Sequence, residues 1–201
     1  MWKLRKFWHS GQHLAGARRG SILIETALLL PILLLLLAGA IETARLMLAQ
    51  QKVSNLSSQT ADMMAQAEFG LSESEIIDIF AAIAHISDPF DLVANGRVVV
   101  SGVIGTNGGS TANEIAWQRC AGDLSTVSSE LGNEGASNVD IPGEIELATN
   151  EMAIVAEVSM TYEPFIFAGF FDPMTLGSDA TFRPRFGALS TISADAPPAS
   201  C

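Results

Sequence analysis

The sequence predicts an α+β fold in which a long N-terminal helix packs on a small antiparallel sheet. Three observations predict it: an apolar run at 22–41, a three–four pattern of apolar residues after it, and strand-like alternation spread over the second half of the 201-residue chain. The expected organisation is a basic cytoplasmic leader (1–20), a transmembrane helix (21–45) and an extracytoplasmic α+β domain (46–201).

The apolar run at 22–41 predicts one membrane-spanning helix. Glu25 is its only charged residue, and twenty helical residues rise about 30 Å, the thickness of a bilayer's hydrocarbon core. Five of the 11 basic residues lie in the first 20 positions, which contain no acidic residue. This excess places the N-terminus in the cytoplasm and residues 46–201 outside the membrane.

The rest of the chain is strongly acidic. It contains all 22 acidic residues and only six basic ones, which argues against a nucleic-acid-binding protein. The hydrophobic content of 48% and the charged content of 16% exclude a disordered chain.

The residues alone leave three interpretations of the N-terminal region. The helix is a permanent envelope anchor; or it is a signal peptide cut at Ala38–Ala40, which releases a soluble binding protein beginning at Ile41; or the chain is cut between Gly20 and Ser21 and keeps the apolar helix. N-terminal sequencing separates them, because the mature chain starts at Met1, Ile41 or Ser21 respectively.

Glu25 favours the cut after Gly20. A charge at mid-membrane costs about 2.5–3.5 kcal/mol, and less near an end, so an acid there calls for a partner. The cut creates that partner as the α-amine of Ser21, one helical turn before Glu25, in the same chain or in a neighbouring subunit. In the alternative interpretation, Glu25 simply reaches the cytoplasmic headgroups.

Several segments resemble the TadE-like pseudopilins of tight-adherence (Flp-type) pilus systems over about residues 18–65. They read RRGSILIE at 18–25, LLLP at 28–31, IETAR at 41–45 and QQKVSN at 50–55. The resemblance implies a pilin-like fold, cleavage after Gly20 by a prepilin peptidase, and a minor structural role in pilus assembly. It implies a single-pass protein of the bacterial inner membrane with a periplasmic C-terminal domain. The implied partners are the lipid bilayer, other pilus subunits and inner-membrane assembly components.

Two features refine the predicted long helix. Pro31 removes a backbone hydrogen bond inside the apolar run and predicts a kink or a loosened turn at about 27–31. Beyond the membrane the helix is expected to continue to residue 69, before Gly70, with a narrow apolar seam. That seam packs on this chain's own sheet or on a partner's helix; it comprises Leu46, Ala49, Val53, Leu56, Thr60, Met63 and Ala67.

The C-terminal half predicts a second helix and four strands. Ser72–Glu75 is a capping-box arrangement that opens a helix ending near Ile86. The strands are expected at 97–104, 115–120, 151–162 and 182–186. Residues 122–150 are polar, show no clear period and predict a long loop.

No catalytic or cofactor site is predicted. His9, His13 and His85 are too scattered to converge, and Asp140, Glu144 and Glu146 lack the spacing of a calcium loop. Cys120 and Cys201 are expected to form a disulfide in an oxidising compartment, the alternative being two free thiols. The phenylalanine-rich run at 164–171 predicts either an exposed contact surface for a subunit or a lipid surface, or rings folded under the sheet.

Overall fold

The computed structural model describes residues 17–68, 70–106, 112–143 and 145–201. The chain divides between Ala44 and Arg45 into two compact units. The long N-terminal helix and the small antiparallel sheet are both present, which confirms the predicted α+β fold class.

Helix α1 (Ala17–Ala65) is 49 residues long and continues through Pro31. It begins four residues earlier than predicted and ends before the predicted residue 69, at Ala65. The end is earlier because the chain tightens: the amides of Gln66 and Ala67 bond to carbonyls three residues back. Gly70, with a φ of +95°, then turns the chain into the short strand β1 (Leu71–Ser72).

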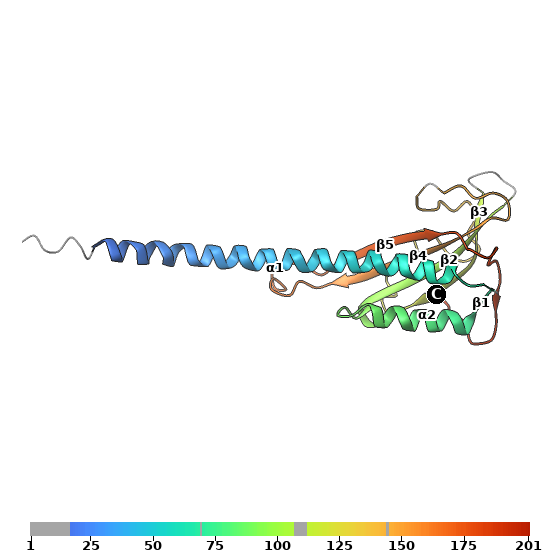
Figure 1. Ribbon diagram of the computed structural model, residues 1–201, viewed down its shortest axis with the longest axis horizontal. Helices are drawn as coiled ribbons and strands as arrows, with labels where there is room; N and C mark the ends of the chain where they lie inside the picture. Colours follow the sequence, from blue (N-terminus) through green and yellow to red (C-terminus); the bar gives the residue numbers. More distant parts are fainter. Residues whose placement is uncertain (1–16, 69, 107–111, 144) are drawn as a thin grey trace, which may run out of the picture. The chain divides into compact units, whose positions relative to one another are not determined.

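In the second unit, four antiparallel strands form the sheet, in the order β3-β2-β4-β5 (Figure 1). Their bounds are β2 (Gly96–Gly105), β3 (Asn113–Ala121), β4 (Met152–Tyr162) and β5 (Met174–Phe182). The predicted strands at 97–104, 115–120 and 151–162 are therefore confirmed within one or two residues. The short helix α3 (Leu92–Asn95) leads into β2, and β1 pairs in parallel with β6 (Ile192–Ser193); neither was predicted.

One face of the sheet packs on the second half of α1 and on α2 (Glu73–Ile86). Alternate residues of β4 from Met152 to Tyr162 enter this core, as their period of two predicts. Val53, Leu56 and Met64 of α1 are fully buried in the same core. The apolar seam of α1 therefore packs on this chain's own sheet.

Helix α2 starts where the sequence predicts. The Ser72 hydroxyl accepts a hydrogen bond from the Glu75 amide at 3.3 Å and caps the helix. The helix buries Ile76, Phe80 and Ile83 against the main core.

The opposite face of the sheet is covered by the loop at 122–150. No strand occurs in its described part, as predicted. Although most residues of the loop are polar, several of its large apolar side chains are buried. Val139, Ile141 and Leu147 are buried in a second core against β2, β3 and β4. Val139 and Ile141 alternate with one acidic residue, and Ile145 and Leu147 alternate with another, but Pro142 and Gly143 separate the two pairs, so neither pair is long enough to predict a strand.

The predicted strand at 182–186 is wrong. The fourth strand is β5 (Met174–Phe182), which pairs with β4 over its whole length. Pro184 lacks the N–H that a ladder requires, whereas β5 contains Gly, Ser and Asp, which are depleted in strands. Pairing with β4 overrides that weak propensity.

Gly102 of β2 provides the space that Trp117 fills. A Cβ at Gly102 would overlap the Trp117 indole and the Met152 methyl group. Moving the indole away would break a hydrogen bond, because its Nε1 donates to the Leu189 carbonyl at 2.6 Å and the residue is buried. Gly177 of β5 differs, because an added Cβ there would meet only Ser159 Oγ at 3.7 Å.

We predict that Gly102→Ala lowers the free energy of unfolding by about 1–3 kcal/mol through overpacking. Gly177→Ala is the matched control and should change it by less than about 0.5 kcal/mol. Denaturant unfolding in detergent micelles, followed by circular dichroism, measures both. Equal midpoints for the two variants would contradict the packing described here.

Candidate functional site

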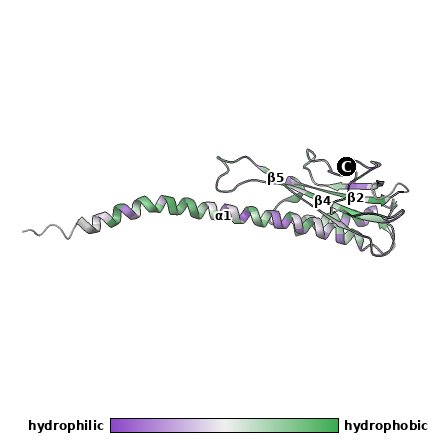
Figure 2. Ribbon diagram, turned by 90° about the horizontal axis from the view of Figure 1, so that it is seen from above, coloured by the Kyte–Doolittle hydropathy of each residue, from purple (hydrophilic) through white to green (hydrophobic). Residues whose placement is uncertain are grey.

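The first half of α1 exposes its large apolar side chains. Every Leu and Ile between residues 22 and 37 is 48–70% exposed. The helix portion Gly20–Ala65 contains a window with a mean hydropathy of 2.5, and by length and composition it is able to cross a membrane. In Figure 2 most of this half of α1 is coloured green, which marks hydrophobic residues. The segment is compatible with a single-pass membrane anchor.

The motif residues of this segment lie in the first turns of α1. The Gly20–Ser21 bond is within the helix, which begins at Ala17, and both Ser21 and Glu25 are exposed. The helix places Glu25 one turn after Ser21, as predicted. In the uncleaved chain the Ser21 nitrogen is a peptide amide, so the ion pair expected after cleavage stays a prediction.

Polar side chains within the apolar half bond to their own helix. The Thr26 hydroxyl donates to the Ile22 carbonyl at 2.9 Å, and the Thr43 hydroxyl donates to the Gly39 carbonyl at 2.8 Å. Such internal bonds satisfy hydroxyl groups where water is absent. Pro31 provides no N–H for the carbonyl of Ala27, four residues before it, although the chain stays helical there. The kink expected at Pro31 stays a prediction.

The comparison with protein families falls on this same helix. Residues 20–62 match the family model described as TadE-like protein. This segment is TadE-like. The resemblance drawn from the motifs at 18–25, 28–31 and 41–45 is thereby confirmed, and it indicates involvement in tight-adherence pilus systems. The TadE-like match lies within α1 and includes none of the sheet. Searches of curated proteins and of solved structures gave no match.

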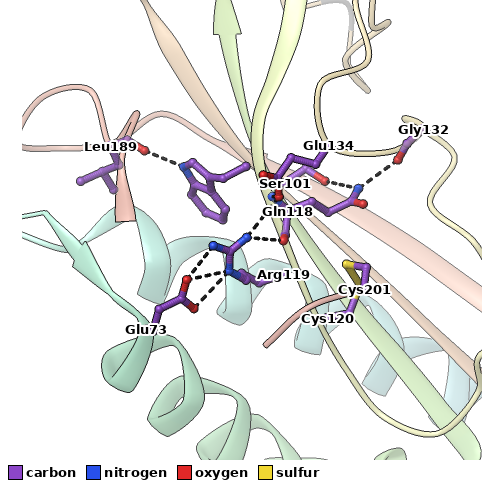
Figure 3. Close-up of polar contacts among 10 residues, drawn as sticks. Glu73, Ser101, Gln118, Arg119, Cys120, Gly132, Glu134, Leu189 and Cys201 are labelled. Carbon is purple, nitrogen blue, oxygen red and sulfur yellow. Dashed lines mark hydrogen bonds and ion pairs between the residues drawn. A yellow bond between two sulfur atoms is a disulfide. The ribbon is translucent and has the colours of Figure 1, made fainter. Parts of the chain in front are cut away.

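In the second unit, an ion-pair network joins α2, β3 and the loop at 122–150 (Figure 3). Arg119 of β3 donates to Glu73 through Nη2 at 2.6 Å and through Nε at 3.0 Å. Its Nη1 lies 3.2 Å from the carboxylate of Glu134. The hydrogen bonds that Arg119 donates to the Glu73 carboxylate are the main cause that raises the pKa of Arg119, so the guanidinium stays charged although it is partly buried. The sequence identified Glu73 only as part of a helix start.

The C-terminal tail is attached to β3 in two ways. Cys120 and Cys201 form a disulfide with a Cα–Cα distance of 5.0 Å. The Cys120 amide also donates a hydrogen bond to the Ala199 carbonyl at 2.9 Å. The disulfide closes a loop with a sequence separation of 81 residues, which includes β4, β5 and the loop at 122–150.

The remaining candidate residues do not converge. His85 is exposed at the end of α2, whereas His9 and His13 lie outside the described residues. Asp140 and Glu146 are exposed, and Glu144 is not described. Among the residues that the structure describes, no three His, Cys, Asp or Glu side chains form a group able to hold a metal ion.

We predict that Cys201→Ser lowers the free energy of unfolding by about 4 kcal/mol, because a long loop then becomes free in the unfolded chain. Denaturant unfolding in micelles, with and without a thiol reductant, measures the effect. Reductant should bring the parent chain to the midpoint of the variant and leave the variant unchanged. Labelling of both thiols after treatment with reductant shows that the disulfide of the parent chain is broken. If the midpoint of that reduced parent chain is unchanged, the predicted stabilisation by the disulfide is wrong.

Proposed function

We propose that this protein is a membrane-anchored minor pseudopilin of a tight-adherence pilus system. The proposal rests on two features that occur in the same segment, the family match and a single acidic residue. The TadE-like match begins at Gly20, at the start of an exposed apolar helix stretch that has a single acid, Glu25, in its second turn. An ordinary anchor gains nothing from that acid, whereas a subunit that must join an assembly can use it for pairing. The role is structural, and no catalytic step is assigned to the chain.

The proposed processing step is cleavage after Gly20 by a prepilin peptidase. It removes five basic residues and gives Ser21 a free α-amine. In lipid, the carboxylate of Glu25 and this amine attract each other strongly, because the surrounding dielectric is low. When processed helices pack together, the amine of one subunit and the carboxylate of another form the same pair between chains. Packed helices exclude water from the pair more fully than a single helix does, so the pair is stronger between chains and favours assembly over dispersal in the bilayer.

The proposed topology has the leader in the cytoplasm and residues 46–201 in the periplasm. The excess of basic residues before the apolar segment supports this orientation. The disulfide between Cys120 and Cys201 also supports it, because the periplasm is oxidising and the cytoplasm is reducing.

We predict that Gly20→Leu blocks processing when the chain is produced together with its prepilin peptidase. The bulky side chain replaces a glycine at the proposed cut. Gly39→Leu is the matched control, because an added Cβ at either glycine meets no atom within 4 Å and both side chains therefore start in open space. Electrophoretic mobility should show the shorter chain for the parent and for Gly39→Leu only. Cleavage of Gly20→Leu at the parent's rate would contradict a cut at this bond.

We predict that Glu25→Ala still inserts and is still cleaved but joins pilus assemblies at least tenfold less, because the Ser21 amine loses its partner. Thr26→Val is the control, since the Thr26 hydroxyl bonds only within its own helix, to the Ile22 and Leu23 carbonyls. Cross-linking in membranes, followed by separation of assembled from free subunits, measures the yield. Normal assembly of Glu25→Ala would show that the ion pair has no role.

A further inference from the structure

The loop between β4 and β5, residues 163–173, presents phenylalanines outward. Phe165, Phe170 and Phe171 are 71%, 84% and 62% exposed. The loop is nonetheless folded: the amides of Phe170 and Phe171 both bond to the Phe167 carbonyl, at 2.8 and 3.1 Å. The rings of Phe167 and Phe171 meet edge to face, with centroids 6.2 Å apart. The turn therefore holds apolar rings at the surface in a defined conformation.

Arg45 fixes the place of this loop along the chain's helix. The guanidinium carbon of Arg45 lies 4.7 Å from the centroid of the Phe165 ring, a cation–π contact. Arg45 follows the apolar run at 22–41 by four residues, which is a rise of about 6 Å along a helix. If that run spans the hydrocarbon core, Arg45 lies in the headgroup layer, and Phe165 lies there with it.

The side chains in and around the loop indicate what kind of partner the exposed phenylalanines contact. Met47 and Leu48, which follow Arg45 in α1, are 61% and 60% exposed, so exposed apolar side chains continue along the helix past Arg45. Residues 163–173 contain no basic side chain, and they begin with Glu163 and include Asp172. Attraction to anionic headgroups is therefore not the source of binding. Aromatic rings favour the boundary between headgroups and acyl chains.

We propose that the β4–β5 loop is a second membrane contact, in which Phe170 and Phe171 enter the interface of the bilayer that α1 crosses. The inference rests on the anchoring part of the proposed function but does not depend on cleavage or on a role in pili.

Depth-dependent fluorescence quenching of the full chain tests this inference. Phe170→Trp and Phe186→Trp are compared in phosphatidylcholine vesicles with and without bromine on the acyl chains, as difference spectra against the parent. Phe186 is the matched control: it is 60% exposed, and its neighbour Arg185 bonds through its amide to the Ala65 carbonyl. Ala65 lies twenty residues beyond Arg45, about 30 Å along α1.

We predict that brominated lipid quenches Phe170→Trp at least twofold and that its emission is blue-shifted, whereas Phe186→Trp is unquenched. High salt should not change the result, since the contact is apolar. Unquenched, red-shifted emission from Phe170→Trp would overturn the proposal, because the loop then lies in water. A blue shift without quenching would also overturn it and would indicate that another protein subunit covers the loop.

Leu33→Trp separates failure of the loop contact from failure of the anchor. Leu33 lies within the apolar run and is 62% exposed. If brominated lipid quenches Leu33→Trp but not Phe170→Trp, the anchor is in the membrane and only the loop contact is rejected. If Leu33→Trp is also unquenched, the proposed anchoring itself is wrong.

Discussion

The apolar surface of the first half of α1 is the constraint on which the rest of the structure depends. Twelve leucine and isoleucine side chains between residues 22 and 37 are exposed, and no other part of the described chain covers them. Water solvates such a surface poorly, so the segment is compatible with lipid surroundings as a single-pass membrane anchor. The same surroundings make the lone carboxylate of Glu25 costly unless it is paired. The proposed pairing of Glu25 with the Ser21 amine removes that cost.

The second half of α1 has a different role, although the helix is continuous. From Ala49 onward its apolar residues are buried, and Val53 and Leu56 reach zero exposure in the main core. The helix that carries the apolar surface is therefore also the central helix of the folded unit. The disulfide between Cys120 and Cys201 attaches the C-terminal tail to β3, and the Glu73–Arg119 ion pair attaches α2 to the same strand.

Much of this architecture is predictable because its signals are local. The apolar run, the cap at Ser72 and the alternation of β4 each follow from a pattern within a few residues. The strand β5 is not predictable in this way, because its propensity is weak and its pairing with β4 decides its conformation. The packing of Val139 and Ile141 and the Glu73–Arg119 contact likewise depend on residues distant in sequence. For the site, the motif names Gly20, Ser21 and Glu25, but the amine that we propose as the partner of Glu25 is created only by the proposed cleavage.

The intact mass of the protein extracted from membranes of cells that contain the prepilin peptidase tests the central claim most directly. The account predicts a membrane-bound chain that starts at Ser21, retains the whole apolar segment and contains the disulfide between Cys120 and Cys201. A chain that starts at Ile41 and is recovered in the soluble fraction would contradict it. So would a chain that still starts at Met1 although the peptidase is active on other substrates in the same cells.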